Sequence, residues 1–121
     1  MTVQQMLNSL PILQRLMELK LPIKKAHKVY SLAKVINEQR EFFINEEKKL
    51  IEKYEAEVLE NGGVRFKDAE TQGLFLQEHA VLMDYEVTEV KGIELSFDDL
   101  GDAEFMPAEL LQLEGVINFV E

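Results

Sequence analysis

The sequence predicts an α+β fold that is mostly helical: an antiparallel helical hairpin with a short N-terminal segment, one or two short β-strands and a C-terminal helix. Three observations carry this prediction. Residues 23–58 contain neither Pro nor Gly and repeat apolar side chains at helical spacing. Residues 69–85 return to helical spacing after a glycine-containing turn. Over residues 87–97 apolar residues recur among polar ones, with an alternation typical of a strand that is clearest from Ile93 to Phe97.

Prolines divide the N-terminal segment, residues 1–22. Pro11 is expected to interrupt the first helical piece, because proline moves the preceding residue, Leu10, away from helical dihedral angles. Pro11 then opens a short helix that Pro22 ends near Lys20, and a much longer helix starts at Ile23.

The long helix is predicted to cover residues 23–58. A second apolar row beside its main seam makes the apolar stripe wider than that of a coiled coil, so we expect the helix to pack against more than one element. Phe42 falls outside the stripe. The main seam consists of Ala26, Val29, Ala33, Ile36, Phe43, Leu50 and Tyr54, and the second row of Tyr30, Ile44, Ile51 and Val58.

The turn after the long helix is predicted at Asn61-Gly62-Gly63, because Asn and Gly tolerate positive φ and can both cap a helix and reverse the chain. A short extended piece, "VRFK", follows. Asp68 is the expected N-cap of a second helix over residues 69–85. Two helices joined by a short connection pack antiparallel, which predicts the helical hairpin.

A strand region is predicted over residues 87–97, with alternation clearest from Ile93 to Phe97 and with Gly92 as a bulge or kink. A single strand needs a pairing partner, and the candidates are residues 64–67 or the N-terminal residues 2–6. The chain is predicted to close with a helix over residues 107–120, with Pro107 in its first turn.

Composition places limits on the class of protein. The chain has 121 residues, 46% of them hydrophobic and 30% charged, which predicts one folded domain rather than a disordered chain. No apolar run approaches the roughly 18–20 residues of a membrane span, and residues 1–20 lack the pattern of a signal peptide, so we expect an intracellular protein without membrane contact. Cysteine is absent, which excludes disulfides, thiolate metal sites and cysteine nucleophiles.

Charge is distributed unevenly along the chain. The net charge is −10, yet residues 1–40 carry seven basic and two acidic residues, whereas residues 41–121 carry six basic and twenty-one acidic residues. This asymmetry favours head-to-tail self-association or an acidic surface that meets a basic partner. Four lysines near the start of the long helix are the only candidate nucleic-acid patch, and no aromatic platform accompanies them, so we expect no direct nucleic-acid binding.

An acidic cluster precedes the predicted C-terminal helix and consists of Asp98, Asp99, Asp102 and Glu104. An EF-hand loop requires Gly at its sixth position and spaced oxygen ligands, and this stretch has Gly at the fourth position and Met-Pro where ligands belong. Its carboxylates are better explained as turn formers and as groups that favour a helix N-terminus. They remain candidates for partner binding, together with Phe42, Ile44 and Ile51.

Enzyme signatures are missing from the sequence. His27 and His79 lie in no zinc-binding pattern, the serines lie outside any Gly-x-Ser-x-Gly context, and no glycine-rich phosphate loop occurs. We therefore assign no catalytic, cofactor-binding or metal-binding residue and predict that the protein is not an enzyme.

Several segments together resemble a family of small proteins from tailed bacteriophages and prophages that is known only as a domain of unknown function. The segments are "LPIKKAHKVYSLAKVINE", "LIEKYE", "VRFKD", "LMDYEV" and "PAELLQLEGVINF". Shared features are found at Leu21-Pro22, Lys53-Tyr54, Glu86-Val87 and Pro107-Ala108-Glu109-Leu110.

The resemblance implies a phage origin and a location in the bacterial host cytoplasm or in the virion, and it brings no catalytic residues. The function we expect is that of a non-enzymatic interaction protein, a virion or assembly component that acts through oligomerisation. The alternative is an acidic inhibitor of a basic host or anti-phage defence protein, with carboxylates placed where phosphates would lie.

Overall fold

The computed structural model describes residues 1–120 and confirms an α+β fold that is mostly helical. Over these residues the elements are α1 (Val3–Met17), α2 (Ile23–Lys53), β1 (Glu57–Val58), β2 (Val64–Arg65), α3 (Ala69–Met83), β3 (Ile93–Ser96), the 3-10 helix η1 (Phe97–Leu100), α4 (Pro107–Leu113) and β4 (Ile117–Val120).

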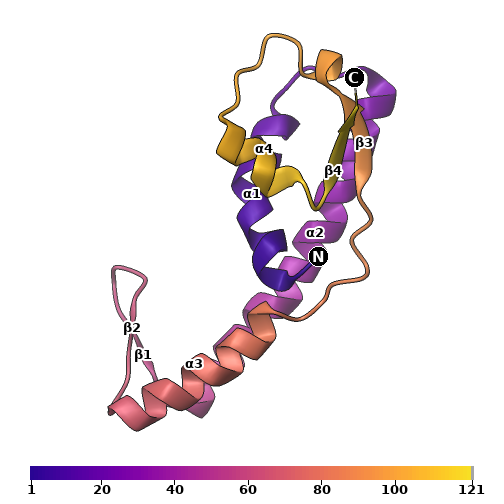
Figure 1. Ribbon diagram of the computed structural model, residues 1–121. Coiled ribbons are helices and arrows are strands. Elements are labelled where there is room, and N and C mark those ends of the chain that lie inside the picture. The colour runs from indigo at the N-terminus through magenta and orange to yellow at the C-terminus, as the bar shows by residue number, and fades with distance from the viewer. Residues whose placement is uncertain (121) are drawn as a thin grey trace.

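The molecule has a globular end and an extended end (Figure 1). We call the globular end the body; it contains α1, the N-terminal half of α2, β3, η1, α4 and β4. We call residues 40–85 the arm; it contains the C-terminal half of α2, α3 alongside it, and the β1–β2 hairpin at the tip. The predicted helical hairpin is thus present, and it projects away from the rest of the fold.

The core lies in the body and reaches the root of the arm. The predicted seam of α2 contributes buried residues from Val29 through Ile36 to Phe43. From α1 come Met6, Leu13 and other residues on the same side of that helix. β3, α4 and β4 complete the core from the C-terminal part of the chain.

Helix α1 contradicts the expected interruption at Pro11, because it runs continuously through that residue. Pro11 is exposed, so its ring does not meet the core, and the helix gives up one backbone hydrogen bond at that point. Ile12, Leu13 and Leu16 just after it are buried, and their burial outweighs this loss. At the start, Thr2 and Gln5 form a reciprocal capping box.

Helix α2 ends at Lys53, earlier than the predicted Val58. The amide of Ala56 donates to Ile51 O at 3.0 Å, the amide of Glu55 donates to Glu52 O at 3.1 Å, and Glu55 has a φ of 51°. This is the Schellman geometry of a helix C-terminus, in which the left-handed position is usually Gly. Here Glu occupies it, so the sequence carried no visible stop signal.

Asn61-Gly62-Gly63 forms the turn of the β1–β2 hairpin instead of capping α2. β1 and β2 pair antiparallel, with Val58 opposite Val64, and Gly62 has a φ of 85°. The side-chain oxygen Oδ1 of Asn61 accepts a hydrogen bond from the Gly63 amide at 2.9 Å. "VRFK" therefore pairs within the arm and not with the predicted strand in the body.

Helix α3 begins as predicted, with the Asp68 side chain accepting from the Thr71 amide at 2.7 Å. It ends at Met83, two residues before the predicted end. An aromatic cluster at the tip joins the hairpin to the helices, with the Phe75 ring 5.0 Å from that of Phe66 and 6.4 Å from that of Tyr54.

The C-terminal region corrects the predicted helix over residues 107–120. α4 ends at Leu113, and residues 117–120 form β4, which pairs parallel with β3 so that Leu95 lies opposite Phe119. Val116, Ile117 and Val120 fit a helical repeat as well as a strand, so their spacing was ambiguous. β-branched residues favour the strand, and Gly115 lies in the turn that separates it from α4.

Gly92 lies where the chain enters the β3–β4 sheet. A side-chain carbon at this position would lie 3.3 Å from Val116 O, which also accepts the Ile93 amide at 2.9 Å. Gly92 therefore allows a close approach of two backbones.

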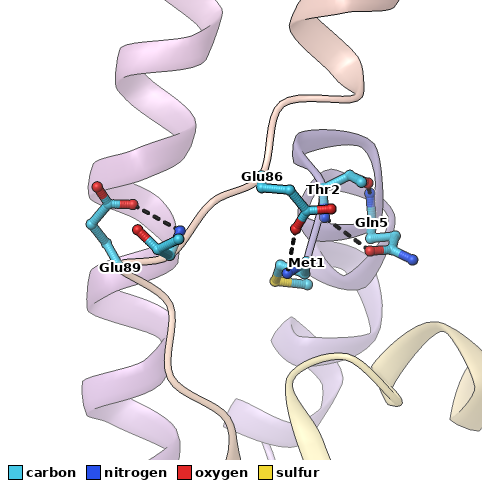
Figure 2. A network of polar contacts seen from close by, with 6 residues as sticks. Met1, Thr2, Gln5, Glu86 and Glu89 are labelled. Carbon is cyan, nitrogen blue, oxygen red and sulfur yellow. Dashed lines mark hydrogen bonds and ion pairs between the residues drawn. The ribbon is translucent and has the colours of Figure 1, made fainter.

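The N-terminus is held against the segment that leaves the arm. Figure 2 shows the Glu86 carboxylate directed at the Met1 amino group, a pair whose N–O distance is 3.3 Å. Beside it, the amide of Val3 donates to Tyr85 O at 3.0 Å and that of Val87 donates to Met1 O at 2.8 Å. The start of α1 and the end of α3 are thus fixed together at the junction of body and arm.

Candidate functional site: an apolar groove on the arm

The acidic cluster lies in the body, at η1 and in the loop that follows it, far from the arm (Figure 1). Asp99 has a structural role here: its carboxylate accepts from the Ser96 amide at 2.8 Å and lies 3.7 Å from Lys25 Nζ. The hydrogen bond from the Ser96 amide, with Lys25 nearby, holds the pKa of Asp99 below its usual value.

The other acidic residues of this cluster are exposed, and they differ from Asp99 in their contacts. Glu104 contributes its backbone oxygen, which accepts from the Arg15 guanidinium at 2.7 Å. Arg15 also pairs with Glu109 at the start of α4, and this contact lowers the pKa of Glu109. Asp98 and Asp102 extend into solvent. The turn role expected for the cluster matches the contacts of Asp99, and the carboxylate that caps the start of α4 is that of Glu109, which accepts from the Met106 amide at 2.9 Å.

A groove with a volume of about 810 Å³ lies on the arm between α2 and α3. Among its lining residues Phe43 is buried, and Leu50 and Leu82 are half-buried. One wall comes from α2 and the other from α3, and both walls mix apolar and charged side chains. The α2 wall consists of Phe42, Glu46, Lys49 and Lys53, and the α3 wall of Gln77, Glu78, Val81 and Tyr85.

Helix periodicity explains why these residues share one groove. Positions 42, 46, 49 and 53 of α2 are spaced by four, three and four residues, which places them in one row along the helix. Positions 78, 81 and 85 follow with steps of three and four residues on and just beyond α3. The two rows flank the line along which α2 and α3 touch.

Large apolar side chains in the groove are left uncovered. Phe42 is 57% exposed, Val81 74% and Tyr85 58%. Part of their surface is used internally, since the Phe42 ring packs edge-on against Phe43 at 5.1 Å and Tyr85 lies 5.7 Å from Phe43. The groove therefore presents aromatic and aliphatic surface to whatever approaches it.

Ion pairs cross or border the groove. Lys53 Nζ lies 2.8 Å from Glu78 Oε1, which joins the two walls, and Lys49 Nζ lies 2.9 Å from Glu46 Oε1 on the α2 wall. The hydrogen bond between Lys53 and Glu78 raises the pKa of the lysine and lowers that of the glutamate, so both groups are charged near neutral pH.

Ile44 and Ile51 do not belong to the groove. Both are half-buried. An α-helix turns by about 100° per residue, so positions 44 and 51 lie on roughly the opposite side of α2 from Phe42. Of the residues predicted for partner binding, only Phe42 therefore lines this surface. The structure separates the predicted candidates into the body loop, the groove and the far flank of the arm.

Helix α3 is apolar on more sides than the chain covers. Phe75 and Met83 are buried, whereas Leu74, Leu76 and Val81 are exposed. A helix that is apolar around much of its circumference is typical of an element with several neighbours, and α2 supplies only one of them. The sequence carried a signal for this second apolar side, because Val81 and Tyr85 are spaced by four residues on a different side of the helix from the buried Met83.

Histidines and other ligand-type side chains are dispersed. His79 Nε2 lies 3.0 Å from Glu47 Oε2 beside the Phe75 ring, and His27 is on α2 in the body. Within residues 1–120, no group of three or more His, Asp or Glu side chains is placed to hold a metal ion.

None of the helices within residues 1–120 has the length and apolar character needed to span a membrane. Comparison with family models, with curated proteins and with solved structures finds no match to this chain.

Proposed function

We propose that this chain is a non-enzymatic interaction protein that assembles with other protein through the groove of its arm. The observation that carries the proposal is the uncovered apolar surface at Phe42, Val81 and Tyr85. Exposed apolar patches bordered by polar residues mark interaction sites, and aromatic side chains are favoured at the centres of interfaces. A groove between two helices is also the shape that receives a third helix.

The proposed biological setting is a tailed bacteriophage, with the protein as a virion or assembly component in the host cytoplasm or the virion. The resemblance in sequence supports this setting. An arm that projects from a compact body supports the assembly role, because it presents a long helical surface beyond the bulk of the molecule (Figure 1).

A second candidate function is inhibition of a basic host or defence protein. One observation favours it: the segment from Asp68 to Glu86 carries carboxylates and neither Lys nor Arg, and most of it is exposed along α3. A row of carboxylates can occupy a surface that otherwise binds phosphates. In this alternative the acidic groups that bind lie on α3 and not in the loop at Asp98–Glu104.

The interaction proposal is tested by photo-crosslinking in cells that carry the native gene. A photoreactive phenylalanine analogue at position 42 is expected to give covalent adducts with protein, which mass spectrometry identifies as this chain or as another protein. The same analogue at Ile23, which is exposed in the body, is the control. Adducts at position 42 no more abundant than those at position 23 would overturn the proposal, and a nucleic-acid-binding protein as the adduct would favour the inhibitor.

A further inference from the structure

The charges on the two walls of the groove are of different kinds. Glu78 is the charged lining residue of the α3 wall, and residues 68–86 around it contain five carboxylates and no Lys or Arg. The α2 wall carries Lys49 and Lys53 together with Glu46, which leaves it one positive charge in excess. An α3 segment is therefore electrostatically suited to lie beside the end of α2, and it is unsuited to lie beside another α3.

We infer that the groove binds a second copy of this chain, in a symmetric dimer in which α3 of each copy packs along the α2 wall of the other. The inference rests on the proposed function and names its partner. Symmetric dimers are the commonest protein oligomers, and they require a surface that is complementary to itself. The groove meets this requirement because the α3 wall carries Glu78 and no cation, whereas the α2 wall carries two lysines and one glutamate.

Contacts within one copy fix how the residues of α2 and α3 line up along the length of the arm. Lys53 lies at the same height along the arm as Glu78, and Phe43 at the same height as Tyr85. A two-fold axis parallel to the arm preserves these levels between copies. It therefore brings Lys53 of one copy near Glu78 of the other at one end of the groove, and Phe42 near Tyr85 of the other copy at the opposite end.

This arrangement makes a four-helix bundle from two α2–α3 hairpins, with the grooves facing each other as its core. Phe42, Val81 and Tyr85 then become covered, and Leu50 and Leu82 lie beneath them. Each helix is antiparallel to its neighbour in the other copy, as in common four-helix bundles. A two-fold axis across the arm would instead place α3 on α3, with a Glu78 wall on both sides of the contact.

Light scattering after size exclusion gives the first test. Purified wild-type protein is expected to run as a dimer of the 14.0 kDa chain at micromolar concentration. Val81→Lys is expected to weaken the dimer by more than about tenfold, because it places a lysine against the lysine-bearing α2 wall of the other copy, while the side chain is exposed in the single chain. The matched control, Ile23→Lys, alters an exposed apolar residue of the body and should leave the dimer unchanged. A monomeric wild type, or equal effects of the two variants, would overturn the inference.

Cross-linking tests the arrangement, and the chain is suited to it because it has no cysteine of its own. Differently tagged Lys49→Cys and Val81→Cys chains are mixed and treated with a short bis-maleimide. We expect mixed cross-linked dimers to exceed those formed by Val81→Cys alone. Leu76→Cys, on another side of α3, replaces Val81→Cys in the control. Dominant Val81–Val81 products would show α3 lying on α3 and overturn the arrangement.

Different results would overturn the dimer and the interaction function. A monomer in these experiments, combined with adducts to another protein at position 42 in cells, would overturn the dimer and retain the interaction function. Absence of adducts in cells would overturn the interaction function itself.

Discussion

Single residues at chain turns determine where several elements stop. Asp99 is one of them: it completes a reciprocal cap with Ser96, whose hydroxyl accepts from the Asp99 amide at 3.3 Å. The cap ends β3 and starts η1, so a residue that looked like part of an anionic surface serves the local fold.

Asp99 predicts a dependence of stability on pH. The pKa of Asp99 is lower in the folded chain than in the unfolded chain, so folding favours the ionised carboxylate. The resulting stabilisation is fully present above the unfolded pKa of about 4, and it is lost as pH falls through the folded pKa. Asp99→Asn should therefore lower the melting temperature at pH 7, and the difference from wild type should shrink below pH 4. Asp98→Asn, on the same turn and exposed, is the control and should change little at either pH. Thermal melts from pH 2 to pH 7 measure both, and a constant difference for Asp99→Asn across that range would contradict the prediction.

Glu55 is strained in a way that a substitution can relieve. A left-handed conformation costs an L-residue with a side chain roughly 1–2 kcal/mol, and Gly adopts it without this cost. Because Gly also gains freedom in the unfolded chain, Glu55→Gly should stabilise the protein by a smaller net amount, about 1 kcal/mol. Denaturant unfolding measures this change. Glu57→Gly, two residues away in β1, is the control and should be neutral or destabilising, and a destabilised Glu55→Gly would argue against this helix end.

At the scale of elements, long patterns were predictable and single-residue exceptions were not. The seam of α2 from Val29 to Phe43 and the cap at Asp68 follow from side-chain periodicity and hydrogen-bonding chemistry, and both are present. Pro11 and Glu55 contradict the usual positional preferences, and tertiary packing or local hydrogen bonds decide their conformations.

The same distinction applies to the strand partner and to the candidate site. β4 was missed because Val116, Ile117 and Val120 satisfy two periods at once. Phe42 was correctly singled out as lying off the apolar stripe of α2. The α3 wall of the groove was not predicted as a separate surface, since a sequence does not say which of two adjacent apolar sides a neighbour covers.

Adjacent phenylalanines on α2 predict opposite mutational effects. Phe43 is buried, so Phe43→Ala should destabilise the fold by about 3–5 kcal/mol at any protein concentration. Phe42→Ala removes exposed surface and should leave the stability of the single chain within about 0.5 kcal/mol, while weakening the dimer. Denaturant unfolding at low and high protein concentration separates the two effects, because only binding to a second copy makes stability depend on concentration. A Phe43→Ala protein as stable as wild type would remove this seam from the core.

The whole molecule couples a well-packed body to an arm whose own packing is thin. The body combines helices with a sheet. The arm contains the end of α2, α3, a β-hairpin whose strands have two residues each, and the aromatic cluster at Phe75. The junction at Met1 and Glu86 holds the root of the arm in place (Figure 2). Stability should accordingly fall from body to tip, and association would add to it along α3.

Hydrogen exchange tests this gradient and the role of the arm together. Regions with few buried contacts open with low free energy, so amides in β1, β2 and the outer turn of α3 should exchange fastest, and those of α1 and β3 slowest.

In the dimer, protection of α3 and of the end of α2 should rise with protein concentration, while the body should remain unchanged. Because apolar side chains supply most of the proposed contact, this rise should persist in roughly 0.5 M salt, where charge contacts alone are strongly screened. Val81→Lys provides the matched control, since its arm should exchange equally fast at every concentration. Protection that rises in the body instead, or that disappears in salt, would place the contact elsewhere or make it electrostatic.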